Sequence, residues 1–107
     1  MIVTPSASVA GHRVAKTLGL VKGNTIRARH LGKDIMAGLK NLVGGEIEEY
    51  TKMMAESREQ AVDRMVSDAK KVGANAIIDV RFSTSYIMGM AAEILAYGTA
   101  VILEEGR

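Results

Sequence analysis

Hydrophobic and polar positions change their spacing along the chain, and the longest regular stretch has helical spacing. Residues 46–72 carry apolar side chains three or four positions apart and contain neither glycine nor proline. Glutamates at the start, lysines at the end and Gly73 directly afterwards favour these boundaries, because each suits its end of a helix. We therefore predict one long helix over residues 46–72, roughly 40 Å long at about 1.5 Å per residue.

The residues after this helix have the two-residue alternation of strands. We predict one strand over residues 76–86 and a second over residues 91–103, joined by Met88-Gly89-Met90. The first strand is expected to divide its side chains between two faces, with Ile78, Val80 and Phe82 on one and Ile77, Asp79, Arg81 and Ser83 on the other.

The residues before the long helix are less regular. Residues 12–29 are predicted to form a hairpin, with Lys22-Gly23-Asn24 as its turn and a bulge near Gly19. Residues 34–43 have the apolar spacing of a short helix, and Gly44-Gly45 separates them from the long one. The whole pattern predicts an α+β fold in one domain over residues 1–107, with the long helix packed on an antiparallel sheet.

The last predicted strand is apolar on both faces. Leu95, Tyr97, Val101 and Leu103 share one face, and Ile94, Ala96, Ala100 and Ile102 share the other. An antiparallel strand with one face in water would alternate apolar with polar residues, so both faces need cover. The long helix can cover one of them. A neighbouring copy of the chain is the favoured cover for the other face, and the short helix or the N-terminal hairpin is the alternative within the chain.

The composition is that of a small globular protein with few aromatic rings. Of the 107 residues, 48% are apolar and 4% aromatic, and there is no cysteine. The absence of thiols excludes disulfides, thiolate catalysis and cysteine-ligated metals. No apolar run reaches the ~18 residues that span a bilayer and no signal peptide is visible, so we expect a cytoplasmic protein. Small core side chains bury little area each, which favours stabilisation by oligomerisation.

Charge is divided unevenly along the chain. Residues 1–40 contain seven basic residues and one acid, whereas residues 41–107 contain seven basic residues and eleven acids. These halves could attract each other within a subunit or between neighbours, or the basic half could face a polyanion. No aromatic residue lies among the basic ones to stack on bases, so nucleic-acid binding is not favoured. The basic set is Arg13, Lys16, Lys22, Arg27, Arg29 and Lys33.

Few residues have the chemistry of a catalytic or metal site. The two histidines, His12 and His30, lack the spacing of metal ligands, and no serine-centred turn accompanies them. Gly44-Gly45 precedes a helix as phosphate-binding glycines do, but the glutamates that follow would repel an anion. Met88 and Met90 offer thioethers that suit Cu(I), although methionines more often fill gaps in a core. We predict no catalytic residue, no cofactor and no metal ligand.

Glu93 is an acid within an otherwise apolar strand. A buried carboxylate needs a partner, and Arg81 on the adjacent predicted strand is the default one, within the chain or between subunits. A carboxylate that acts in a pocket is the alternative.

Several stretches taken together resemble the YbjQ-like family of small bacterial and archaeal proteins, a family labelled as heavy-metal-binding. They run over nearly the whole chain in family order: Arg27-Ala28-Arg29, Gly32-Lys33-Asp34-Ile35, Val43-Gly44-Gly45-Glu46, Tyr50-Thr51, Gly73-Ala74-Asn75-Ala76-Ile77, Arg81-Phe82, Ala92-Glu93 and Ala96-Tyr97-Gly98-Thr99-Ala100-Val101. The resemblance implies a dodecin-like β-α-β-β subunit with extra N-terminal strands, assembled as a homopentameric ring. It implies no established reaction.

The expected function is therefore that of a non-enzymatic homo-oligomeric ring, pentameric as the resemblance implies, with a small ligand of unknown identity. One alternative is a soft-metal or heavy-metal protein that uses Met88 and Met90. The other is a nonspecific polyanion binder that uses the basic N-terminal residues. Cysteine is absent and both histidines lie outside the matching stretches, so the family's metal label is not carried over to any residue.

Overall fold

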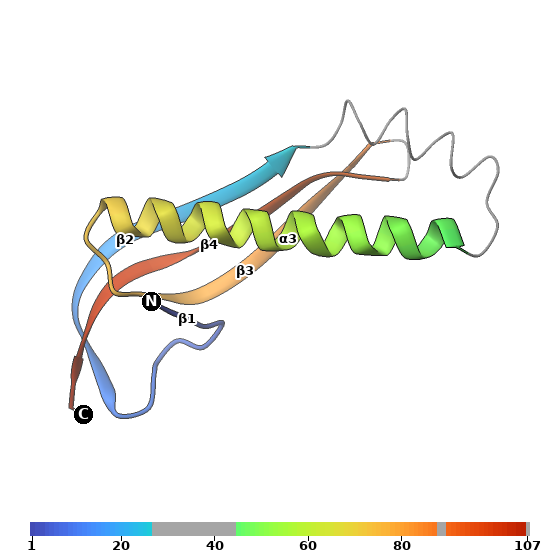
Figure 1. Cartoon of the computed structure of the whole chain (residues 1–107). Coiled ribbons are helices and arrows are strands. Elements are labelled where there is room, and N and C mark those ends of the chain that lie inside the picture. Colours follow the sequence, from blue (N-terminus) through green and yellow to red (C-terminus); the bar gives the residue numbers. More distant parts are fainter. Residues whose placement is uncertain (27–44, 88–89, 107) are drawn as a thin grey trace.

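The computed structural model describes residues 1–26, 45–87 and 90–106. In chain order it contains β1 (Ile2–Val3), β2 (His12–Ile26), α3 (Gly45–Lys71), β3 (Ala76–Ile87) and β4 (Met90–Glu105). The predicted α+β class is confirmed, because α3 lies along one face of a sheet formed by the four strands (Figure 1). The short helix predicted at residues 34–43 lies outside the described residues.

The four strands are arranged in the order β1-β3-β4-β2. β4 pairs antiparallel with both of its neighbours, β2 and β3, in agreement with the predicted antiparallel sheet. β1 adds a short parallel pair, in which Ile2 lies opposite Ala76 and Val3 opposite Ile77, so the complete sheet is mixed. β4, which the sequence predicts to be apolar on both faces, is the central partner of β2 and β3.

The long helix has almost the predicted boundaries, Gly45–Lys71 in place of 46–72. Gly73 has a φ of +83°, a left-handed conformation that glycine adopts at little cost, and its N–H donates to the Lys70 carbonyl at 3.1 Å. The Ala74 N–H donates to the Ala69 carbonyl, also at 3.1 Å. These bonds satisfy carbonyls of the last turn and end the helix.

β2 corrects the predicted hairpin. Lys22-Gly23-Asn24 is not a turn, because the strand continues through it and pairs with β4 along its whole length. A Cβ at Gly23 would lie 2.3 Å from both the Ala61 carbonyl oxygen and the Met65 nitrogen, so glycine lets the α3 backbone lie directly on the strand. The predicted bulge is confirmed, since the pairing with β4 shifts just before Gly19.

The main core lies between α3 and the sheet and uses small side chains. Its buried members are Val21, Ala61, Met65, Ala69, Ile77, Val80, Ile94, Ala96 and Ala100. Ser57 is buried on the same helix, and its carbonyl oxygen accepts a hydrogen bond from the Thr25 hydroxyl at 3.3 Å. Alanine and serine on α3 therefore permit the close contact that glycine permits on β2.

A bulge in β3 reverses part of the predicted faces. Asp79 has a φ of +54°, and the pairing with β4 shifts between Ile78 and Arg81. Ile77 and Val80 consequently both pack in the main core, whereas Ile78 belongs to a second cluster. The prediction that Ile78 and Val80 share a face is wrong, because a bulge inserts one extra residue and interrupts the alternation.

Among the residues that the structure describes, the second face of β4 is covered at one end only. Val101 and Leu103 are buried in the second cluster, where Val9 of the N-terminal segment packs against them. Cover of this face from within the chain was the alternative expectation. The segment before β2 provides that cover, in place of the predicted hairpin. Farther along the strand, Leu95 and Tyr97 are only half-buried. A neighbouring copy is therefore not needed to cover Val101 and Leu103.

Candidate functional site

The helix leaves part of β3 uncovered. α3 packs mainly on β2 and β4 and makes little contact with β3. Phe82 lies opposite the core residue Ala96, so it is on the helix side of the sheet, yet it is 49% exposed. Tyr86, four residues farther along β3, is 66% exposed. Two of the few aromatic rings of the chain are therefore exposed on a surface that α3 does not cover.

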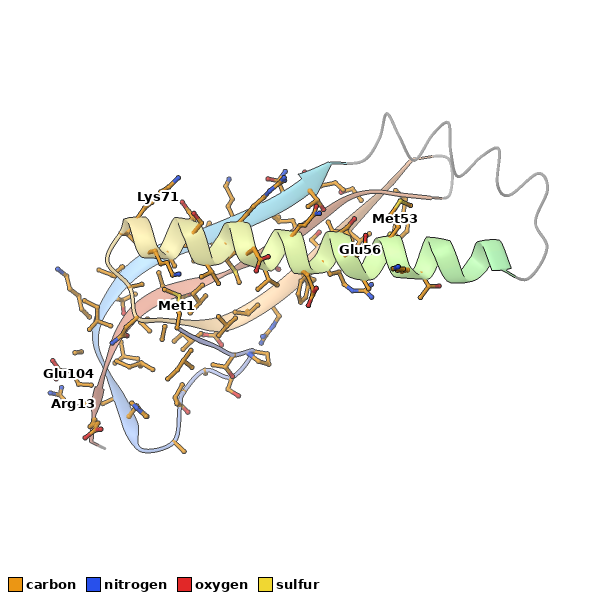
Figure 2. The ribbon with its side chains drawn as sticks, in the orientation of Figure 1. Met1, Arg13, Met53, Glu56, Lys71 and Glu104 are labelled. Atoms are coloured by element: carbon orange, nitrogen blue, oxygen red, sulfur yellow. The ribbon has the colours of Figure 1, made fainter. Side chains whose placement is uncertain are left out.

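A groove of about 630 Å³ lies between α3 and this part of β3. Ala55, Val62 and Phe82 form its apolar part. The remaining lining consists of charged helix residues, of which three are acidic and two basic, and Figure 2 labels Glu56 among them. This α3–β3 groove thus combines an exposed ring with a negative charge balance. Its charged lining is Lys52, Glu56, Arg58, Glu59 and Asp63.

The outer edge of β2 is partly closed by side chains of the helix. The Lys22 N–H donates to the Asp68 carboxylate at 3.3 Å, and the Arg64 guanidinium donates to the Asn24 carbonyl oxygen. Both backbone groups would otherwise be available to another strand. Over residues 13–21 the described part of the chain places no second strand on this side of β2. We call residues 13–21 the β2 open edge.

The outer edge of β3 is closed at its start and open afterwards. The Val80 N–H donates to the Thr4 carbonyl at 3.1 Å, and the Arg81 guanidinium donates to the Pro5 carbonyl at 2.8 Å. Residues 82–87 pair with β4 on one side, and within the described residues no strand pairs with them on the other. We call residues 82–87 the β3 open edge.

Most residues singled out in the sequence lie away from this groove. The Nδ1 atom of His12 is 3.0 Å from the Ala10 carbonyl oxygen, and Arg13 forms an ion pair with Glu104 at the far end of the sheet (Figure 2). Lys16 and Lys22 are exposed on β2. The other candidates lie outside the described residues or have side chains that do: Arg27, Arg29, His30, Lys33, Gly44, Gly45, Met88 and Met90.

Arg81 and Glu93 are not paired within the chain. Arg81 lies opposite Tyr97 in the sheet, whereas Glu93 lies opposite Ser85. The half-buried Glu93 carboxylate accepts a hydrogen bond from the Asn24 side-chain amide at 3.1 Å. The default ion pair is therefore wrong for a single chain, and a neutral amide takes the place of the arginine as the partner of the acid.

The described residues do not fit a heavy-metal centre. They contain no group of three or more histidine, cysteine, aspartate or glutamate side chains that could hold an ion. One ring nitrogen of His12 already faces a backbone carbonyl. No metal chemistry is therefore assigned to them. In a separate respect, none of the helical segments in the described ranges is long and apolar enough to cross a membrane.

Reasoning from the sequence missed the α3–β3 groove and both open edges. Part of the signal is visible, because Phe82 and Tyr86 are separated by four residues and are surrounded by serine and threonine. In a strand that spacing places both rings on one face. The missing information is the order of strands in the sheet, which decides whether the helix covers that face.

Comparison with known proteins agrees with the family resemblance over the full length. The family model YbjQ_1, described as "Putative heavy-metal-binding", matches residues 1–104. A UPF0145 protein of Dehalococcoides mccartyi is 65% identical over 97% of this chain and 100% of its own length. A UPF0145 protein of Thermus thermophilus is 53% identical over 100% of this chain and 94% of its own.

The solved structures include one with a similar arrangement of elements. It is a crystal structure of a protein of unknown function from Pediococcus pentosaceus, described as belonging to the DUF74 family. The TM-score is 0.56, with 97% of this chain and 98% of that chain covered, and the identity is 16%. That likeness supports the fold alone. The family model and the full-length relatives identify the chain as a member of the YbjQ family, whose curated relatives are named UPF0145 proteins and carry no enzymatic name.

Proposed function

We propose that this chain is a non-enzymatic, self-assembling protein that works in the cytoplasm as a closed homo-oligomeric ring. The observation that carries the proposal is the amount of surface that one chain exposes, 6958 Å². A compact monomer of 11.5 kDa exposes roughly 5,800 Å². The excess is on the order of 1,000 Å², similar to the area of about 800 Å² that each partner buries in a stable interface.

The shape of the chain supports the proposal. Its radius of gyration is 17.1 Å and its dimensions are 56 × 23 × 17 Å, whereas a compact domain of this length has a radius of gyration of about 13 Å. The elongation follows from the arrangement of α3, β2, β3 and β4, which run side by side (Figure 1). Such a thin layer gains most stability when neighbouring copies add to it.

The proposed ring has five subunits, as the resemblance to the YbjQ-like family implies. The β2 open edge and the β3 open edge are different surfaces of one sheet. Contacts between different surfaces repeat from copy to copy, and they form a ring when the rotation between copies closes. The α3–β3 groove would then lie beside a subunit boundary, where it offers space for the predicted small ligand.

The experiment is a measurement of mass in solution on the full chain. Multi-angle light scattering after size-exclusion chromatography, and native mass spectrometry, should find one species at five times the 11.5 kDa chain mass at micromolar concentration. A monomer under these conditions would contradict self-assembly. A different single closed number would contradict the pentamer while keeping the ring.

A further inference from the structure

The two open edges offer backbone groups in a defined order. The Val80 N–H points outward, because it donates to Thr4 on that side, and backbone groups two residues apart in a strand point the same way. Phe82 and Thr84 therefore direct their N–H and carbonyl groups to the outside of β3. By the same rule, because the Lys22 N–H points outward, the backbone N–H and carbonyl groups of Leu20 also point to the outside of β2.

The two open stretches are comparable in length and limited by the chain itself. On β2, Asp68 and Arg64 close the edge from Lys22 onward. On β3, the N-terminal segment closes the edge as far as Arg81. At about 3.3 Å per residue the remaining stretches, 13–21 and 82–87, are each roughly 20–30 Å long. Among the described residues, one stretch can therefore pair with the other without displacing a hydrogen bond at either edge.

Charge and cover favour a second copy as the occupant. Lys16 lies opposite Ile102 on the helix side of the sheet, so a β2 added beside β3 would bring this lysine toward the α3–β3 groove, whose lining has one more acid than base. Because α3 packs on β2, the added strand also brings its own helix to the same side of the sheet. The negative balance of the groove is then matched by a basic residue of the partner.

We propose that the β2 open edge of each copy pairs with the β3 open edge of the next, so that the sheets of all subunits continue into one another. This inference rests on the proposed self-assembly and names the surfaces that carry it. Main-chain hydrogen bonds supply the contact, as in strand addition to an exposed sheet edge. The α3–β3 groove then lies at the boundary with the neighbouring copy.

Cysteine cross-linking tests the pairing directly, because the chain has no cysteine of its own. Thr17 and Ser85 are exposed, lie near the middle of the two open edges, and share the face of the sheet opposite to α3. Within one chain they lie opposite Val101 and Glu93, roughly 26 Å apart along β4 at about 3.3 Å per residue, too far for a short bismaleimide.

The double variant Thr17→Cys/Ser85→Cys should give a covalent ladder of dimer to pentamer with a short bismaleimide, and each single variant should give none. Cross-linking of a single variant to itself would overturn the inference in favour of a symmetric interface. An oligomer by light scattering without any ladder would overturn the inference while leaving the proposed function intact. A monomer throughout would contradict both.

A proline on the β3 open edge provides the second test. Thr84→Pro removes an outward N–H that no described strand uses, so circular dichroism should keep the folded spectrum while the mass falls to that of the 11.5 kDa monomer. Thr84→Ala keeps the N–H and is the matched control, which should remain assembled. A folded Thr84→Pro variant that assembles like the control would overturn the inference.

Discussion

Two stretches on the outer edges of this sheet are treated in opposite ways. Along β2, from Lys22 to Asn24, the helix reaches over the edge and places a carboxylate and a guanidinium on the outward backbone groups. Along β3, from residue 82 onward, the described residues place nothing beside the edge, and two aromatic rings stand exposed next to it. Natural sheets usually protect edges against unwanted pairing. A stretch left open in a sheet that closes other stretches of its edges therefore supports the proposed pairing.

The closed edge depends most strongly on Gly23. Replacement by alanine would place a Cβ 2.3 Å from backbone atoms of Ala61 and Met65, so the helix must move away from β2. We expect Gly23→Ala to lower the free energy of unfolding by about 3 kcal/mol, measured by urea titration at fixed protein concentration. Gly19→Ala is the control, because nothing lies within 4 Å of its Cβ and only its positive φ opposes the change. Equal losses for the two variants would contradict the close approach.

Asn75 closes the end of β4 with a side chain instead of a strand. Its amide nitrogen donates to the Leu103 carbonyl at 2.9 Å, and its amide oxygen accepts from the Leu103 N–H at 2.7 Å. Asn75→Ala removes both bonds and should lower the free energy of unfolding by about 2 kcal/mol in the same titration. Asn75→Asp keeps the acceptor alone and should give a smaller loss. No change in either variant would show that these bonds contribute nothing to the closure.

Replacement of Asp68 is expected to change the free energy of unfolding least, and it tests most directly whether the helix protects the β2 edge. Asp68→Ala frees the Lys22 N–H and should lower the free energy of unfolding by about 1 kcal/mol. The larger consequence is unwanted pairing, seen as turbidity that begins at a lower temperature on heating. Ser67→Ala changes an exposed neighbour on the same helix and should behave as the original chain does. Identical turbidity curves for both variants would remove the protective role of Asp68.

Local sequence patterns predicted the helix and the fold class, but they failed where contacts with residues distant in the chain determine the local conformation. The end of α3 was predictable, because Gly73 follows the last apolar turn and its conformation depends on its neighbours alone. The prediction of a turn at Lys22-Gly23-Asn24 was wrong, because the same three residues are compatible both with a turn and with a strand on which a helix packs closely. The deciding contact is with Ala61, which lies far along the chain.

The site was harder to predict than the fold for a similar reason. The faces of β3 depend on the bulge at Asp79, whose N–H donates to the Ser6 carbonyl at 3.0 Å. Alternation within β3 contains no sign of that contact. The exposure of Phe82 depends in turn on which strands lie beneath the helix. Both the bulge and the exposure of Phe82 depend on how distant elements pack together, so they can be seen only in the folded structure.

The N-terminal segment stops serving as a strand at Val3. Thr4, Pro5 and Ser6 then fasten it to β3 around the bulge at Asp79, and the segment afterwards turns away toward β2. If this segment continued along β3 for a few more residues, it would pair with the β3 open edge itself, and the chain would then remain a monomer. The length of the N-terminal strand would then decide whether the chain is a monomer or the subunit of an oligomer.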